Sequence, residues 1–137
     1  MNRRQPGTRI PLTKQLVVQV AIEIADNDGL EALSMRRLGR ELNVEAMALY
    51  YHYTNKNELI EDMLNAVHSE IITPDNDVAD WREAMRARAE SVLDVVSRHS
   101  WAATIMESGA NPGPATMQDR EAMVRCFRQA GFSIEAT

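Results

Sequence analysis

The sequence predicts an all-α protein, and three observations lead to this fold class. Apolar residues recur at spacings of three and four in several segments, as they do on one face of a helix. Helix-capping residues (Ser, Thr, Asn and Asp) stand directly before these segments. The sequence has no apolar–polar alternation over six residues and no Asn-Gly hairpin turn. The chain has 137 residues, 45% of them hydrophobic and 26% charged, which is typical of a globular protein.

Clear start and stop signals bound the first two expected helices. Thr13 is placed to cap the first helix, and Gly29 is placed to end it. Ser34 is placed to cap a second, shorter helix. Asn43 follows that helix, and asparagine tolerates the left-handed backbone conformation of a tight turn. These signals predict two helices, the second of which is followed by a tight turn at Asn43.

Two further helices complete the expected N-terminal half. A short helix is expected from about residue 45 to residue 51, and a fourth helix begins after Asn55. Glu58 lies three residues beyond Asn55, so the two side chains form an asparagine version of the capping box. Pro74 is expected to stop the fourth helix, because proline cannot continue the helical hydrogen bonding.

A polar linker over residues 73–80 predicts a boundary between two domains. The first domain would span residues 10–72 and the second residues 80–137. The second domain contains an expected loop over residues 107–115, rich in Gly and Pro. The chain stops where another helix would begin, so the expectation is a truncated helical domain.

The second domain is expected to begin with a long helix. Asp80 and Glu83 form a capping-box pair before this helix, which runs to about Arg98. A short helix over residues 101–106 and another helix over residues 117–130 are expected to follow. The spacing predicts these inward-facing side chains on the long helix: Met85, Ala89, Val92, Leu93 and Val96.

Composition excludes several classes of protein. Cys126 is the only cysteine, which excludes an internal disulfide framework and a Cys-cluster zinc site. No run of about 18 apolar residues or signal peptide is evident, so we expect a cytoplasmic protein that does not associate with a membrane. The formal net charge is -5, yet residues 1–22 hold four basic residues and no acidic one. A basic face can therefore coexist with an acidic total.

Residues 34–53 predict a helix-turn-helix. Two short helices meet across a tight turn, and four apolar residues are spaced to pack the corner between them: Leu38, Leu42, Val44 and Leu49. Other residues of the second helix then have little apolar reason to face inward: Ala46, Met47, Ala48, Tyr51 and His52. In a helix-turn-helix the second helix presents its first turns to base edges in the major groove. Lys56 combines an ammonium group with a helix N-terminus, and both attract phosphate.

A family resemblance is carried by two stretches: Ala25-x-x-x-Gly29-Leu30-x-x-Leu33-Ser34-Met35-Arg36-x-Leu38-x-x-x-Leu42-x-Val44, and Ala48-Leu49-Tyr50-x-His52-Tyr53-x-Asn55-Lys56-x-x-Leu59. With these motifs, residues 13–64 resemble the DNA-binding domain of the tetracycline-repressor family of bacterial transcription regulators. Shorter motifs of the second half resemble the tetracycline-repressor branch: Asp80-Trp81-Arg82, His99-Ser100-Trp101, Gly113-Pro114 and Gln129-Ala130-Gly131-Phe132-Ser133. The resemblance implies an N-terminal three-helix DNA-binding domain and a helical ligand-binding and dimerisation domain.

The resemblance also implies partners and DNA-binding residues. The partners would be a palindromic double-stranded DNA operator, a second copy of the chain, and a small-molecule inducer of unknown identity that releases the operator. Three residues would lie where the second helix meets phosphate or base edges: Ser34, Met35 and Arg36. Four would fill base-reading positions: Glu45, Ala46, Met47 and Ala48. Four would clamp the DNA backbone: Tyr50, Tyr51, His52 and Lys56.

Two positions depart from the family pattern or limit what it implies. Glu45 stands where a small hydroxyl cap is common; glutamate caps poorly and repels phosphate, so a cytosine amine is its expected partner. Met106 stands near the loop where the tetracycline repressor offers an imidazole to a drug-bound magnesium ion. Neither tetracycline, nor a metal ion, nor a cofactor is therefore expected.

The inducer pocket is expected among apolar and flexible side chains of the second domain. Its candidate residues are Met85, Arg88, Val92, Trp101, Met106, Met117 and Met123. The alternative interpretation of the methionines is flexible filling of the core.

Two other function classes remain open at this point. One is a helical protein-interaction module that has lost DNA binding, which Glu45 favours. The other is a small helical enzyme, but the sequence has no Glu-x-x-His pair, no Gly-rich phosphate loop and no Gly-x-Ser-x-Gly motif. No catalytic residue is therefore predicted, and a DNA-binding regulator is the preferred interpretation.

Overall fold

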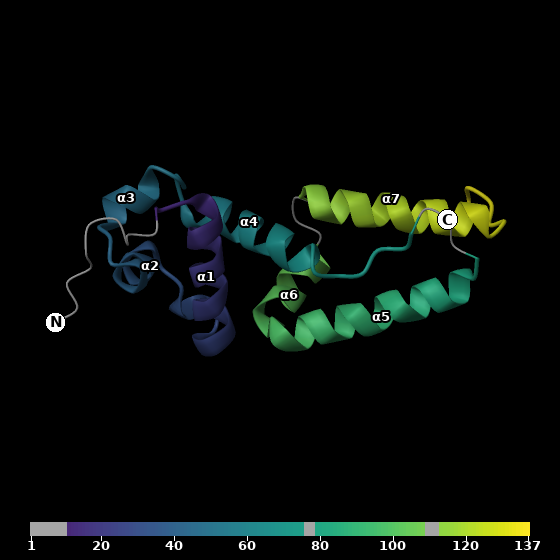
Figure 1. Ribbon diagram of the computed structural model, residues 1–137, viewed down its shortest axis with the longest axis horizontal. Helices are drawn as coiled ribbons and strands as arrows, with labels where there is room; N and C mark the ends of the chain where they lie inside the picture. Colours follow the sequence, from purple (N-terminus) through teal and green to yellow (C-terminus); the bar gives the residue numbers. More distant parts are fainter. Residues whose placement is uncertain (1–10, 76–78, 109–112) are drawn as a thin grey trace.

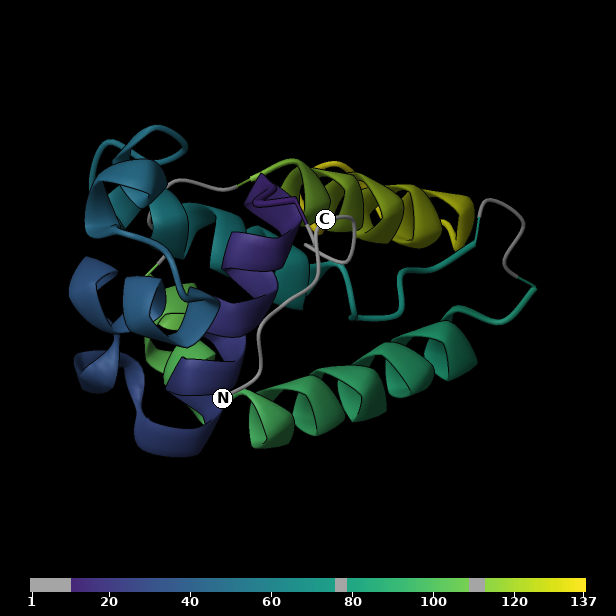
Figure 2. The same cartoon turned by 60° about the vertical axis from the view of Figure 1, so that its left-hand side comes forward.

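The computed structural model describes residues 11–75, 79–108 and 113–137, and its regular elements are all helical. The elements are α1 (Lys14–Asp28), the 3-10 turn η1 (Leu30–Ala32), α2 (Met35–Leu42), α3 (Ala46–Tyr50), α4 (Lys56–His68), α5 (Trp81–Arg98), α6 (Ser100–Ser108) and α7 (Pro114–Gln129). Figure 1 shows α1, α2 and α3 at one end, with α4 leading from them towards α5, α6 and α7. Figure 2 shows the same arrangement with the α2–α3 end turned forward. The predicted all-α class is confirmed.

The predicted start and stop signals act at the first two helices. The hydroxyl groups of Thr13 and Ser34 accept hydrogen bonds from backbone amides three residues ahead, at 3.1 Å and 3.0 Å. Gly29 ends α1 with a backbone φ of 89°, a value that residues with a Cβ atom rarely adopt. Asn43 ends α2 in the left-handed conformation, with φ of 55° and ψ of 46°. Local sequence therefore sets the bounds of α1 and α2.

The fourth helix begins as predicted but ends earlier. Asn55 accepts a hydrogen bond from the Glu58 amide at 3.0 Å, and the Glu58 carboxylate accepts one from the Thr54 amide at 3.0 Å. The two side chains thus accept hydrogen bonds from two free amides. The carboxylate of Glu58 binds the amide of Thr54, one residue before the cap, whereas a standard capping box binds the amide of the cap itself. The helix ends at His68 with its C-cap at Ser69, so the prediction that Pro74 stops it is wrong. Turns formed by residues 69–71 end α4 before proline is reached.

The N-terminal helices enclose one apolar core. Its buried members come from α1, α2, α3, the first half of α4 and the segments that connect these helices: Val17, Val18, Ala21, Ile24, Ala25, Leu33, Met35, Leu38, Leu49, Tyr53, Leu59 and Met63. Gly39 brings α2 and the start of α3 together, because a Cβ atom there would lie 2.8 Å from the backbone oxygen of Val44. The buried Tyr53 hydroxyl donates to the Asp62 carboxylate at 2.6 Å. Burial, and then this hydrogen bond, raise the pKa of Tyr53.

The predicted inward face of α5 is partly wrong. Ala89 is exposed and Leu93 is 70% exposed, whereas Ser91 and Val95 are buried. The Ser91 hydroxyl accepts a hydrogen bond from the Ile72 amide at 2.8 Å, which fixes this face of α5 against the segment after α4. Val95 joins a second apolar cluster with Val67, Ile71 and Ala102. These tertiary contacts choose a neighbouring face of an amphipathic helix, which the period alone could not do.

The remaining expected elements hold with small changes. Asp80 caps α5 by accepting from the Arg82 amide at 3.0 Å rather than through a reciprocal pair with Glu83. The expected 107–115 loop is shorter than predicted, because α6 runs to Ser108 and α7 begins at Pro114. Residues 109–112 of that loop lie outside the described residues. None of the helices in the described parts of the chain is long and apolar enough to cross a membrane.

A buried carboxylate joins three helices of the second half. Asp119 of α7 is 2% exposed and accepts two hydrogen bonds from Arg88 of α5, at 3.1 Å from Nε and 2.5 Å from Nη2. His68 at the end of α4 places its Nε2 3.3 Å from the same carboxylate. Burial alone would raise the pKa of Asp119, but the bonds and charge of Arg88, helped by His68, hold it below its ordinary value. The folded protein therefore favours the ionised form of the Asp119 carboxylate.

Candidate nucleic-acid interface

The turn between α2 and α3 fixes which side of α3 faces outward. The Val44 amide donates to the Gly39 carbonyl at 2.9 Å, directly after the left-handed Asn43. Leu49 of α3 then lies fully buried in the core, with 0% of its surface exposed. Because residues two apart on a helix point to different sides, burial of Leu49 turns Met47 and Tyr51 outward. The predicted helix-turn-helix geometry is present.

The outward side of α3 exposes large side chains that apolar packing does not explain. Met47 is 78% exposed, and Tyr51, which follows the helix, is 88% exposed. Tyr50 is also exposed, and the Tyr51 ring meets the His52 ring edge-on at a centroid distance of 5.3 Å. The small side chains of Ala46 and Ala48, like His52, are partly exposed. A short helix that displays Met and Tyr in this way has the shape of a recognition element.

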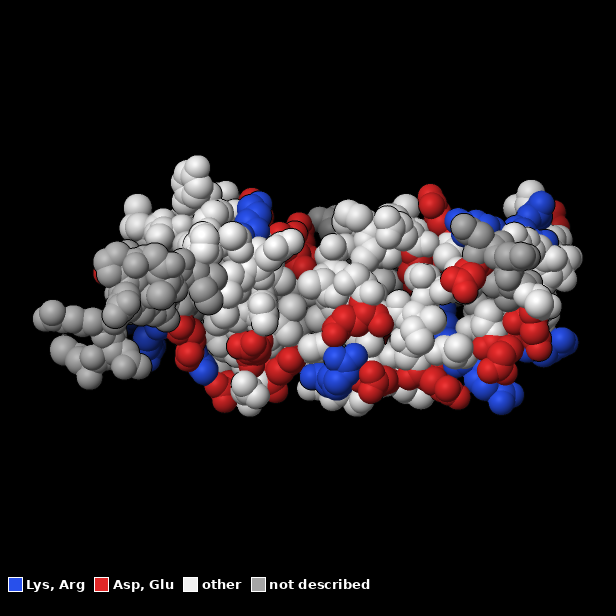
Figure 3. Space-filling view, in the orientation of Figure 1, with Lys and Arg blue, Asp and Glu red and all other residues white. Residues whose placement is uncertain are grey.

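Cationic side chains flank α3 from α2 and α4. Arg37 is bound to Asp28 and Glu41, so it serves the fold; the hydrogen bond that it donates to Asp28 raises its pKa. Arg36 and Arg40 are exposed and make no ion pair within the described residues. Lys56 is partly exposed at the first position of α4. In Figure 3, acidic and basic side chains crowd the lower edge of the visible face, below α1 and along α5.

One predicted DNA-binding side chain lies in the core instead of on the surface. Met35 is 8% exposed and belongs to the N-terminal apolar core. Ser34 itself is exposed, but its hydroxyl already accepts the amide of Arg37 at 3.0 Å. Glu45 is exposed at the start of α3 and makes no side-chain cap, as expected for glutamate.

The residues predicted for an inducer pocket lie on α5, α6 and α7. Arg88 is bound to buried Asp119, and the Trp101 indole N–H donates to Asp26 at 2.7 Å. Val92, Trp101 and Met106 pack against the second apolar cluster. Met117 is exposed beside a shallow hollow along α7. The polar groups of Arg88 and Trp101 thus join helices, while Met85 and Met123 are partly buried.

A polar junction that the sequence did not reveal joins the two halves of the chain. Asp26 near the end of α1 contacts His99 Nδ1 at 2.8 Å as well as the Trp101 indole. Glu70 after α4 lies 2.8 Å from His99 Nε2 and accepts from Arg98 at 3.1 Å. These residues are up to 75 positions apart, so no local pattern could have paired them. The junction connects α1 and the segment after α4 to the start of α6.

No candidate metal site accompanies this surface. Within the described residues, no group of three or more His, Cys, Asp or Glu side chains is arranged to hold a metal ion. Cys126 is buried in α7 as a free thiol. The functional candidates are therefore the exposed side of α3 and the charges beside it.

Comparison with known proteins agrees with this geometry. Residues 17–63 match the family model described as bacterial regulatory proteins of the tetR family. Residues 73–137 match the model described as the tetracyclin repressor-like C-terminal domain. The chain belongs to the TetR family of helix-turn-helix transcription regulators, in the branch that resembles the tetracycline repressor. This family consists of regulators rather than enzymes, as the sequence predicted.

Individual relatives resemble the chain along most of its length. The HTH-type transcriptional repressor DrrR1 of Streptomyces coeruleorubidus is 36% identical over 133 residues, which cover 96% of this chain and 49% of DrrR1. ActR of Streptomyces coelicolor, solved in complex with actinorhodin, is 32% identical with a TM-score of 0.82, covering 92% of this chain and 60% of ActR. BioQ, solved with its double-stranded DNA operator, is 33% identical with a TM-score of 0.74, covering 90% of this chain and 74% of BioQ. The chain spans about half the length of curated relatives such as DrrR1.

Proposed function

We propose that this protein is a cytoplasmic, ligand-responsive transcriptional repressor. In this proposal it binds a palindromic double-stranded DNA operator as a homodimer, and a small-molecule inducer releases it. The observation that carries the proposal is the outward side of α3, where Met47 and Tyr51 stand exposed beside a rigid core. The family membership supports the same function, since a relative was solved with its operator and another with actinorhodin.

The proposed DNA contacts follow from exposure and charge. Ala46, Met47 and Ala48 face base edges in the major groove, and Glu45 accepts a hydrogen bond from a cytosine amine. A second set contacts the sugar-phosphate backbone: Ser34, Arg36, Tyr50, Tyr51, His52 and Lys56. Arg40 joins this set because it is exposed and unpaired within the described residues of α2. The inducer site stays a proposal without assigned residues beyond the partly buried side chains of the second half.

Lys56 is expected to contribute affinity without sequence preference. Its ammonium group lies at the start of α4, where the free amides of the first turn also attract a phosphate. Genomic DNA fragments selected by electrophoretic mobility shift should yield an operator whose binding weakens steeply with salt. Lys56→Ala should weaken binding to all sequences alike and lower the slope of log affinity against log salt by about 1. An unchanged slope would show that Lys56 does not contact a phosphate.

The runner-up function is a helical protein-interaction module, which the exposed Glu45 favours because its charge opposes phosphate. The same selection separates the two functions. A repressor enriches a common sequence from genomic fragments and loses affinity with salt. An interaction module enriches none, and Glu45→Gln does not create binding to any fragment.

Met47 is expected to read a thymine methyl group. Its exposed apolar side chain finds only one apolar partner in the major groove, the C5-methyl of thymine. Replacing thymine by uracil at one position of the operator should therefore weaken binding by at most about 1–2 kcal/mol. The scan replaces one thymine at a time, and Met47→Ala should remove most of the difference at the sensitive position. Equal binding of every uracil operator would place Met47 away from the bases.

A further inference from the structure

Residues 51–55 connect the end of α3 to the start of α4, and Tyr53 lies in the middle of this connection. Its backbone amide donates to the carbonyl of Leu49 in α3 at 2.9 Å. Its hydroxyl donates to the carboxylate of Asp62, in the second turn of α4, at 2.6 Å. Tyr53 is therefore bonded to α3 through its main chain and to α4 through its side chain.

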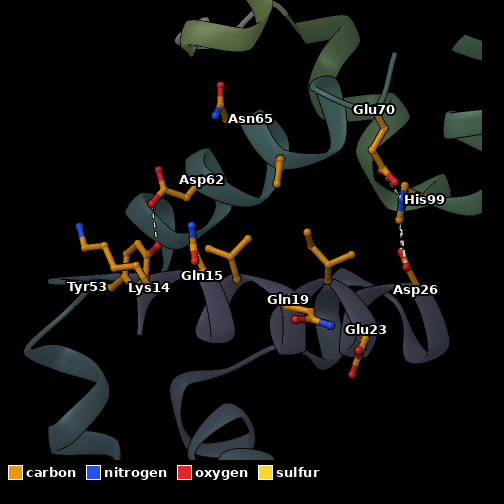
Figure 4. Close-up of a pocket in the computed structure, with 13 residues that line it drawn as sticks. Lys14, Gln15, Gln19, Glu23, Asp26, Tyr53, Asp62, Asn65, Glu70 and His99 are labelled. Carbon is orange, nitrogen blue, oxygen red and sulfur yellow. Dashed lines mark hydrogen bonds and ion pairs between the residues drawn. The ribbon is translucent and has the colours of Figure 1, made fainter. Parts of the chain in front are cut away.

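The ring of Tyr53 is held independently of its hydroxyl. Tyr53 is 1% exposed in the N-terminal core, and the Lys14 ammonium lies 5.0 Å from the centroid of its ring. Figure 4 shows the Tyr53 hydroxyl and the Asp62 carboxylate pointing toward each other, with Lys14 beside the ring. Burial, followed by the bond to Asp62, raises the pKa of Tyr53, so the hydroxyl stays a proton donor in neutral solution. Removal of the hydroxyl alone should leave the ring in the core and delete its bond to α4.

The two residues after Tyr53 are bonded only to the first turn of α4 by the side-chain contacts that begin this helix. The Thr54 amide donates to the Glu58 carboxylate, and the Asn55 side chain accepts from the Glu58 amide, both at 3.0 Å. These two bonds span four and three residues, whereas the Tyr53–Asp62 bond spans nine. The Tyr53–Asp62 bond therefore ties the connection to the body of α4.

Side chains proposed to contact the DNA backbone lie on both sides of Tyr53. Tyr51 and His52 precede it, with ring centroids 5.3 Å apart, and Lys56 follows at the first position of α4. Contacts to phosphates fix the register of a protein on the duplex, so these side chains must keep a fixed spacing. The geometry of residues 51–55 sets that spacing.

We propose that Asp62 is a positioning residue for DNA binding, acting through the hydroxyl of Tyr53. It holds the connection between α3 and α4 so that Tyr51, His52 and Lys56 meet the sugar-phosphate backbone together. The inference rests on the proposed function and deepens it. Asp62 itself does not touch DNA: it lies six residues beyond Lys56, about 9 Å along the helix axis.

The sign of the effect distinguishes positioning from simple charge. Asp62 carries a negative charge that opposes the phosphates, so loss of this charge alone should tighten DNA binding. Asp62→Ala should instead weaken operator binding by about threefold to tenfold, the effect of losing one hydrogen bond. Asp62→Asn removes the same charge but keeps an acceptor for the hydroxyl, so its affinity should match or exceed that of the parent. Tyr53→Phe changes no charge and should weaken binding as much as Asp62→Ala.

Fluorescence anisotropy of the selected operator measures these affinities with the full 137-residue chain, at a temperature where circular dichroism shows every variant folded. Lys56→Ala is then combined with Tyr53→Phe. Because the displaced ammonium fits its phosphate less well, Lys56→Ala should cost less affinity in the Tyr53→Phe chain than in the parent. A purely structural role for the bond would leave this cost unchanged. Tighter binding by Asp62→Ala, parental affinity of Tyr53→Phe, or an equal cost of Lys56→Ala in both chains would overturn the proposal.

Hydrogen exchange of the free protein separates this proposal from the proposed function. The Tyr53 and Thr54 amides, which donate to Leu49 and Glu58, should exchange faster in Asp62→Ala and Tyr53→Phe than in the parent. Amides of α7 should exchange at parental rates in both variants. Unchanged exchange at residues 53 and 54 would overturn the positioning role even if the parent binds its operator. A parent chain that selects no operator would overturn the proposed repressor and, with it, the role of Asp62 in DNA binding.

Discussion

Arg88→Met should lower the free energy of unfolding by about 3–5 kcal/mol, because it leaves the Asp119 carboxylate buried without its main partner. Methionine preserves much of the side-chain length, so the loss reports the missing charge rather than a cavity. Chemical denaturation followed by circular dichroism measures the change. The expected loss is a large share of the free energy of unfolding of a typical domain, which is roughly 5–15 kcal/mol.

The double variant Arg88→Met/Asp119→Leu is the control for this expectation. Removing both charges takes away the uncompensated carboxylate, so stability should return to near that of the parent. A double variant as unstable as Arg88→Met would show that packing, and not the ion pair, explains the loss.

The same pair gives a pH dependence with a definite sign. The pKa of Asp119 is lowered in the folded protein, so the unfolded chain binds its proton first as the pH falls. The stabilisation is therefore complete above the unfolded pKa of about 4 and is lost as the pH falls through the lower folded value. The double variant, which lacks the carboxylate, should lose this part of the acid sensitivity.

Leu49→Asp should unfold the helix-turn-helix, at a cost of several kcal/mol, because it buries an unpaired carboxylate in the core below α3. Helical circular dichroism and the melting temperature measure the effect. DNA binding should disappear together with the fold, since the two core-facing sides of α2 and α3 would separate.

Met47→Asp provides the contrast on the same helix. Met47 is 78% exposed, so the same new charge should leave the melting temperature within about 1 °C to 3 °C of the parent. It should nevertheless weaken operator binding, because a carboxylate would face the phosphates and base edges. If Met47→Asp unfolds the protein while Leu49→Asp does not, the inward and outward sides of α3 have been exchanged.

The sequence by itself determined the local features of this protein. Thr13, Ser34 and Asn55 cap their helices as predicted, because a cap needs only a side-chain acceptor and an amide two or three residues away. Asn43 adopts the predicted left-handed turn for the same local reason. The family motifs, the all-α class and the outward placement of Met47 and Tyr51 were likewise accessible from the sequence alone.

Only the tertiary structure decided which faces meet and which polar groups pair. The residue type of Met35 suits either a core position or a groove-facing position, and the structure places it in the N-terminal core. Leu93 shares the helical period of α5, yet the Ser91–Ile72 hydrogen bond turned a neighbouring face inward. Arg88 and Asp119 lie 31 residues apart, and His99 and Asp26 lie 73 apart, so only folding brings them together. Periodicity fixes spacing along a helix, whereas its rotation and its partners depend on contacts between distant segments.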